Sequence, residues 1–315
     1  SVVPLVSGTA CAIPAVMATR NIEDWKERLI TILVVPFTTC SARLPVYLII
    51  IALVIPNERV LGIFNLQGLT LMLLYLLGFG MSVFSAWVLN KILKIKSKTY
   101  FVIEMPDYKL PLFKNVGINV VEKTKSFVFG AGKIILAISI ILWVLASYGP
   151  TDEFDRAEEI VSEQYGETLS SEEFENHVAS VKLENSYIGM MGKGIEPIVR
   201  PLGYDWKIGI AIVSSFAARE VFVGTLATIY SVGSDEEKTI KDRMAAETNP
   251  ILGGPLFNFA SGISLLLFYA FAMQCMSTLA IVKRETNSWK WPALQLVAMS
   301  GIAYVAALAA FQLLK

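Results

Sequence analysis

The chain has little charge and almost no histidine. Of its 315 residues 17% are charged and one is a histidine, His177, whereas 54% are hydrophobic and the mean hydropathy is +0.56. This composition is too apolar for a soluble domain of this size, so the sequence predicts an integral membrane protein. Since His177 lies in an acidic stretch, a histidine-based catalytic or metal site inside the membrane is excluded.

Cysteine is also scarce, and its placement excludes a disulfide framework. Cys11, Cys40 and Cys275 lie in apolar segments, and none lies in the acidic stretch, where an oxidised bridge would stabilise structure. We therefore expect free thiols. The chain opens with Ser1 rather than Met and without the ordered regions of a signal peptide, so we expect a piece of a longer protein.

Long hydrophobic runs dominate the remainder. A helix needs about 20 apolar residues to cross a bilayer, and residues 1–19 form a shorter, broken candidate. The segments that reach this length are Leu29–Ile55, Gln67–Leu93, Phe129–Tyr148, Trp206–Tyr230, Leu256–Val282 and Trp291–Leu314. The sequence predicts an all-α, polytopic membrane protein with about seven hydrophobic segments.

The connections between these segments differ in charge. Lysines dominate 93–127, which predicts a cytoplasmic loop. Acidic residues dominate 149–204, which we expect on the outer side with amphipathic helices. If every segment spans once, the basic connection Lys283–Lys290 falls outside and breaks the positive-inside rule, so either one late segment is re-entrant or the topology differs there.

The stretch from Pro36 to Pro45 interrupts an otherwise apolar span with hydroxyls, Cys40, Ser41 and Arg43. A charge at the bilayer centre costs roughly 2.5–3.5 kcal/mol on insertion scales, so such residues face a protein interior or a water-filled path. Prolines, including Pro14 in the first segment, free backbone carbonyls that need a partner or a cation. The alternative is a set of kinks whose carbonyls bond to neighbouring helices.

Two parts of the chain resemble each other. Asp24-Trp25-Lys26 precedes a segment carrying Arg43, and Asp205-Trp206-Lys207 precedes one carrying Arg219-Glu220. Transporters often contain inverted repeats of broken helices around a central site. Adjacent helical residues do not face each other, so we expect each arginine to pair with a carboxylate or with helix-end carbonyls. Glu220 would then offer oxygen to a passing cation; alternatively, these charges only hold two helices in register.

Sulfur ligands are candidates for a soft or borderline metal such as ferrous iron. Cys11, Cys40 and Cys275 lie on three segments, and Met17 follows Cys11 by two helical turns. The alternative is that these side chains are core hydrophobes. A nucleotide site is excluded, because 129–134 has a Gly-Lys step without the remaining glycine and hydroxyl of a phosphate loop.

These motifs together resemble the membrane domain of the bacterial ferrous iron transport protein B family. The residues that carry the resemblance are those of Cys11–Arg20, Pro36–Tyr47, Phe101–Tyr108, Ala218–Glu220, Val223–Leu226, Gln274–Ser277, Lys283–Glu285 and Trp289. It implies two gate repeats behind an N-terminal GTPase domain that this chain lacks. It also implies a first gate half with the lysine-rich loop (1–127), a transmembrane helix (128–148), an acidic extracytoplasmic loop (149–204) and a second gate half (205–315).

The resemblance implies gated uptake of ferrous iron through a bacterial inner membrane, with Cys11 and Cys40 on the path and Pro14, Ser41, Arg43, Pro45 and Arg219 building the gates. Cys275, Met17 and Glu220 are further candidate ligands. No stably bound cofactor is expected, and GTP with Mg²⁺ would bind only to the GTPase domain. The expected partners are lipids, that domain, a small cytoplasmic accessory protein and further copies of the chain, with no nucleic acid.

Three other functions stay open at this stage. They are transport of another divalent metal, transport of a nucleoside-like solute, and a membrane-embedded enzyme with Cys40 as nucleophile, although we expect no enzyme in this chain. The extended segment Glu104–Pro111 is either a docking site for a cytoplasmic domain or a linker.

Overall fold

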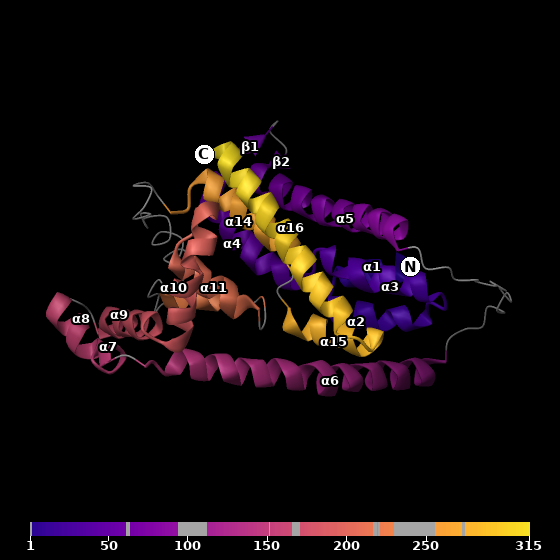
Figure 1. Ribbon diagram of the computed structural model, residues 1–315, viewed down its shortest axis with the longest axis horizontal. Coiled ribbons are helices and arrows are strands. Elements are labelled where there is room, and N and C mark those ends of the chain that lie inside the picture. Colours follow the sequence, from indigo (N-terminus) through magenta and orange to yellow (C-terminus); the bar gives the residue numbers. More distant parts are fainter. Residues whose placement is uncertain are drawn as a thin grey trace.

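The computed structural model is built almost entirely of helices, which confirms the all-α prediction (Figure 1). It describes residues 2–60, 64–93, 112–150, 152–165, 171–216, 219, 221–229, 256–272 and 275–315. In this described part the only strands, β1 (Arg59–Val60) and β2 (Phe64–Asn65), pair as a short antiparallel hairpin.

The helices fall into long, uninterrupted ones and short ones joined by tight turns. The α-helices are α1 (Val2–Gly8), α2 (Ala12–Ala18), α3 (Trp25–Val34), α4 (Leu44–Val54), α5 (Leu66–Ile92), α6 (Phe113–Ser147), α7 (Asp152–Asp155), α8 (Ala157–Tyr165), α9 (Ser171–Glu184), α10 (Tyr187–Val199), α11 (Trp206–Ser215), α12 (Val221–Ile229), α14 (Phe259–Phe271), α15 (Met276–Thr286) and α16 (Lys290–Leu314). The 3-10 turns are η1 (Thr19–Asn21), η2 (Val35–Phe37), η3 (Ser41–Arg43) and η5 (Arg200–Leu202).

Four stretches of the described residues are long and apolar enough to cross a membrane. They are Trp25–Val54, Leu66–Ile92, Phe259–Thr286 and Lys290–Leu314, and each coincides with a span expected from the sequence. The candidate spans at 1–19 and 206–229 are divided instead, into α1 with α2 and α11 with α12. The protein is a multi-pass membrane protein that combines continuous helices with broken ones.

Three of the prolines lie in the first turn of a helix rather than kink one. Pro36 and Pro45 are the second residues of η2 and α4, and Pro14 is the third residue of α2, whereas Pro197 lies inside α10. A helix has no internal acceptor for its first N–H groups, so proline costs no hydrogen bond there. The break between α14 and α15 forms without any proline.

The internal repeat extends to the backbone. The carboxylates of Asp24 and Asp205 cap two helices of 10 residues, α3 and α11, by accepting from the N–H groups of Lys26 (2.7 Å) and Ile208 (3.0 Å). A 3-10 turn, η1 or η5, precedes each cap, and the turn, the cap and the capped helix are shifted by the same 181 positions, as 24 and 205 or 34 and 215 show; Arg43 and Arg219 are 176 positions apart. Each helix ends at a break that carries a buried arginine. The fold therefore contains the same broken unit twice.

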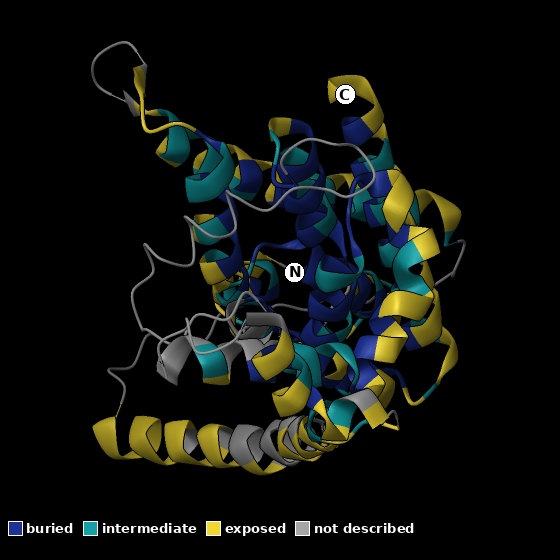
Figure 2. Ribbon diagram, turned by 90° about the vertical axis from the view of Figure 1, so that its left-hand side faces the viewer, coloured by how far each residue is buried: buried dark blue, intermediate teal, exposed yellow. Residues whose placement is uncertain are grey.

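The two units share one apolar core. Tyr47 of α4, Ile208 of α11, Phe222 of α12 and Tyr269 of α14 lie in the same buried cluster. The rings of Phe222 and Tyr269 pack 4.6 Å apart, and the hydroxyls of Tyr204 and Ser264 bond to each other at 2.9 Å. Figure 2 shows that buried positions, in dark blue, gather in the interior of the helical assembly.

Helix α6 begins earlier than the sequence analysis predicts. Its span was expected to open near Phe129 after a loop, but the helix runs from Phe113, two positions after Pro111, with no further proline before Ser147. Part of the expected lysine-rich loop is therefore helical. α6 lies along the edge of the molecule, as Figures 1 and 2 show, and its side chains Ile141 and Trp143 are exposed. Its regular backbone includes 129–134, so no phosphate-binding loop forms there.

The acidic stretch folds into helices. α8 and α9 pack through Ala157, Val161 and Val178, and the ion pair between Lys182 and Glu158 (3.0 Å) also joins them. α10 instead packs against α11 of the second repeat.

The connection 283–290 lies near the start of the lysine-rich loop, so the placement that follows from one crossing for each segment does not fit the fold. Lys26 donates to the carbonyl of Asn90 near the C-terminal end of α5, where that loop leaves, at 3.3 Å. Two positions along α3, Arg28 forms an ion pair with Glu285 near the end of α15 at 2.9 Å. Both connections therefore leave from one end of the molecule, here called the Asn90 end. The β1–β2 hairpin lies at the other end of α5, here called the Asn57 end.

Candidate functional site

Each cysteine lies at a helix break. Cys11, Cys40 and Cys275 are the N-cap residues of α2, η3 and α15, and all three have extended backbone angles. All three thiols are half-buried, and none forms a disulfide, as predicted. Extended residues between helices leave backbone carbonyls without helical partners. Each break therefore places a cysteine sulfur beside backbone carbonyl oxygens that have no partner within a helix.

The first two breaks lie side by side. Ser41 donates two hydrogen bonds to the carbonyl of Ala10, from its hydroxyl (2.8 Å) and from its backbone N–H (3.4 Å). The chain neighbours of these two residues are Cys40 and Cys11. The structure therefore brings the two gate cysteines predicted from the sequence into one region.

Glycines on two helices allow this close packing. A Cβ at Gly8 of α1 would lie 2.6 Å from the hydroxyl of Thr38, and one at Gly78 of α5 would lie 2.6 Å from that of Thr39. Both threonines belong to the break that carries Cys40. The sequence analysis did not single out these glycines, since only the fold reveals which glycines contact a distant break.

Arg43 holds the first break from within. Its side chain is fully buried and donates to the carbonyl of Pro36 at 3.1 Å, with longer contacts of 3.5 Å to those of Phe37 and Thr38. The expectation that a buried arginine pairs with helix-end carbonyls is confirmed here. Tyr47, one turn further along α4, is also fully buried, near both Cys40 and Arg43.

Arg219 has the corresponding role in the second repeat. Its guanidinium donates to the carbonyl of Ala272 at 3.1 Å, across the break between α14 and α15. The N–H of Met276, next to Cys275, donates to the carbonyl of Phe216 at 3.1 Å. Two breaks therefore also pair in this half, with a buried arginine between them. Glu220 lies outside the described residues.

The two pairs of breaks adjoin each other. Phe37 of the first pair lies in one buried cluster with Phe271 and Ala272 of the second. α2 packs against α15, where Ile13 and Val16 share a cluster with Ile281 and Val282. Cys11 and Met17 are both partly buried and pack against this cluster.

The described residues include no group of three histidine, cysteine or acidic side chains suited to hold a metal ion together. Cys275 is thus not joined with Cys11 and Cys40 in one such cluster. What the structure does bring together are the two breaks that carry Cys11 and Cys40, through the hydrogen bonds from Ser41 to Ala10.

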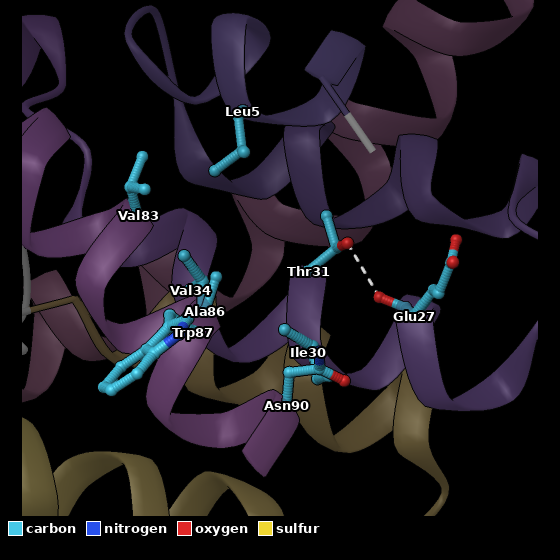
Figure 3. A pocket seen from close by; sticks show the side chains of 9 residues that line it. All are labelled: Leu5, Glu27, Ile30, Thr31, Val34, Val83, Ala86, Trp87 and Asn90. Atoms are coloured by element: carbon cyan, nitrogen blue, oxygen red, sulfur yellow. Dashed lines mark hydrogen bonds between the residues drawn. The ribbon is translucent and has the colours of Figure 1, made fainter. Parts of the chain in front are cut away.

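Two hollows of the described part lie away from the cysteines. One, of about 400 Å³, opens between α1, α3 and α5 and is lined by Leu5, Glu27, Ile30, Thr31, Val34, Val83, Ala86, Trp87 and Asn90. Figure 3 shows that its walls are mainly apolar and that the Thr31 hydroxyl bonds to the backbone carbonyl of Glu27. A second hollow, lined by α3, α5 and α16, is almost wholly apolar. Neither contains a cysteine.

Comparison with known proteins covers nearly the whole chain. A family model described as Gate, Nucleoside recognition, matches residues 1–54 and 128–289, and one described as Ferrous iron transport protein B C terminus matches residues 71–123. No solved structure shows significant similarity.

Several curated relatives carry iron-transport names. An Fe(2+) transporter FeoB of Leptospira interrogans is 44% identical over 99% of this chain, which covers 42% of that protein. One from Methanocaldococcus jannaschii is 32% identical over 98% of the chain and is covered to 40%. A protein of Porphyromonas gingivalis named as a fusion of Fe(2+) transport protein A with the transporter is 32% identical over 97% of the chain and is covered to 36%. The chain thus spans less than half the length of each of these relatives.

Proposed function

The chain belongs to the ferrous iron transport protein B family, and we propose that it forms the path by which ferrous iron crosses the membrane within a longer protein. The observation that carries this proposal is the double hydrogen bond from Ser41 to Ala10, which brings Cys11 and Cys40 together between broken helices. Thiolate sulfur suits ferrous iron better than it suits magnesium or calcium.

In this mechanism the ion leaves water stepwise. It enters from the side of the acidic stretch, whose carboxylates raise the local cation concentration. It then exchanges water for the sulfurs of Cys11 and Cys40 and for nearby oxygens, with Glu220, Cys275 and Met17 as further ligands along the path. Arg43 and Arg219 bond to the carbonyls at the breaks, so they shape the gates rather than bind iron.

Opening of the path is proposed to depend on parts of the protein outside this chain. A GTPase domain that precedes it would bind GTP and Mg²⁺ and drive the gates, and the chain itself would neither catalyse a reaction nor hold a cofactor. The fused transport protein A of the Porphyromonas gingivalis relative supports a small accessory protein as a partner. Lipids and further copies of the chain complete the proposed partners, and the Glu104–Pro111 segment, outside the described residues, is the proposed contact for the GTPase domain.

The nucleoside-like alternative has one supporting observation, the description of the matched gate model. It is weaker, because relatives matched over almost the whole chain are named as Fe(2+) transporters. The enzyme alternative needs a base beside Cys40. The described groups beside Cys40 in the chain or interacting with it are hydroxyls and an arginine, which are poor bases at neutral pH; they are Thr39, Ser41, Arg43, Tyr47 and Tyr75.

Radioactive ferrous iron uptake by the full-length protein tests the proposal. Cys40→Ser should lower uptake about tenfold or more at equal protein level, since a loss of ~1.4 kcal/mol in binding corresponds to tenfold. Unchanged uptake would remove the thiol from the mechanism. Competition by manganese or zinc, compared with competition by nucleosides, separates the metal from the nucleoside alternative.

A further inference from the structure

A buried carboxylate joins three helices at the Asn90 end. The side chain of Glu285, near the end of α15, is only 2% exposed. It accepts hydrogen bonds from Nε of Arg20 to both of its oxygens (3.0 and 2.9 Å), with a further bond from Nη2 of Arg20. Nη2 of Arg28 donates to it at 2.9 Å. One acid thus binds two arginines that are more than 250 positions away in the sequence.

The two arginines lie in elements that neighbour the gate cysteines along the chain. Arg20 lies in η1, which directly continues α2, and α2 begins after Cys11. Arg28 lies in α3, and the chain runs from α3 through η2 to Cys40. Glu285 therefore fixes the Asn90 ends of both elements against α15. Between this contact and the cysteines, apolar side chains such as Val16, Ile32 and Val282 fill the space.

The Arg20 side of the contact stays charged and is accessible to exchange. The hydrogen bonds that Arg20 donates to Glu285 raise the pKa of Arg20 above its ordinary value, so this arginine stays charged throughout the physiological pH range. Its side chain is nevertheless 48% exposed, whereas that of Arg28 is 23% exposed. With two cations on one anion, the group keeps an excess positive charge that another acid can approach. Displacement, not deprotonation, is the way to open it.

We propose that Glu285 is a positioning residue that locks the path closed at the Asn90 end by holding α2 and α3 against α15. Releasing the lock lets these elements separate and exposes Cys11 and Cys40 to that side. The role of the lock in iron release rests on the proposed function, but the lock itself is a conformational property that is measured without iron.

The test uses the full-length protein in membrane vesicles of both orientations. A membrane-impermeant maleimide is added, and mass spectrometry measures the rate at which it labels Cys11 and Cys40. Glu285→Gln should raise the rate about tenfold, only in the orientation that exposes the Asn90 end. Glu285→Asp, which keeps the charge, should restore slow labelling. Glu158→Gln, which removes an exposed ion pair with Lys182, serves as the matched control and should change nothing.

Equal labelling of Glu285→Gln and the parent, or an equal rise in the Glu158→Gln control, would overturn the lock. If Glu285→Gln does not fold, Arg20→Gln replaces it. In that variant Glu285 keeps its ion pair with Arg28, so we expect a smaller rise in the labelling rate. No rise in the labelling rate of Arg20→Gln also overturns the proposal. Iron uptake measured in parallel separates the two claims. Faster labelling together with an uptake that does not depend on Cys40 would leave the lock standing and remove the iron path.

Discussion

Ser41 donates both its hydroxyl and its backbone N–H to the carbonyl of Ala10, although 31 positions separate the two residues. This contact joins the break before α2 to the break before η3. Both breaks carry a cysteine as the N-cap of the next helix. The hydrogen bonds between Ser41 and Ala10 thus link the two predicted gate motifs, and several of the expected outcomes below depend on them.

A short bifunctional thiol reagent should link Cys11 to Cys40. Trypsin cuts between them at Lys26 and Arg28, so the product is two tryptic peptides joined by the reagent and detected by mass spectrometry. Cys40→Ser provides the control without product. Absence of the joined peptides in the parent protein, despite labelling of each thiol singly, would show that the two breaks do not lie together.

Gly78→Ala should destabilise the protein and slow uptake, because the added methyl group would lie 2.6 Å from the Thr39 hydroxyl and 3.2 Å from the Phe37 carbonyl. Overpacking of this kind typically costs about 1–3 kcal/mol. Gly80→Ala, two positions along α5, is the matched control, since nothing lies within 4 Å of its Cβ. Thermal unfolding in detergent measures both variants. Equal midpoints for the two would contradict the packing described for the Cys40 break.

Arg43→Met should lower the free energy of unfolding by roughly 1–3 kcal/mol, the cost of leaving a buried acceptor without its donor. The Pro36 carbonyl would lose its donor at 3.1 Å. Arg156→Met, at an exposed pair with Glu159, is the control, and we expect no measurable change there. A denaturant titration in detergent gives both values; if Arg43→Met were as stable as the control, the arginine would not hold the break.

The two ends of the molecule should label from opposite sides of the membrane. In a background without native cysteines, Ser288→Cys should react from the same side as Lys98→Cys in the lysine-rich loop, and Asn57→Cys from the other side. Helix α5, with 27 residues, separates the ends by about 40 Å at 1.5 Å per residue. Labelling of Ser288→Cys together with Asn57→Cys would contradict the shared Asn90 end.

Much of the architecture follows from local signals in the sequence. The apolar runs predicted the four long stretches, and the Asp-Trp-Lys repeat predicted the two capped helices. Pro36, Pro45 and the buried charge of Arg43 predicted the first break, because proline and arginine are both unfavourable in a continuous helix in lipid.

The remainder depends on contacts between distant residues. The break before Cys275 has no proline, and its link to Phe216 and Arg219 appears only once the chain is folded. In the sequence, Glu285 is one residue of a short basic connection. Only its ion pairs with Arg20 and Arg28 in the fold show that this connection lies at the Asn90 end. Counting one crossing for each apolar segment misplaced this connection because several segments here are divided, whereas its basic charge agrees with the end at which it lies.

The central claim is that ferrous iron contacts Cys11 and Cys40 together on its way through the membrane. The most direct measurement is anaerobic alkylation of the full-length protein with and without ferrous iron, with each thiol quantified by mass spectrometry. The account predicts that iron slows alkylation of Cys11 and Cys40 in parallel, with the same concentration dependence, and that Cys40→Ser abolishes the protection of Cys11. Equal alkylation of both thiols with and without iron would contradict it.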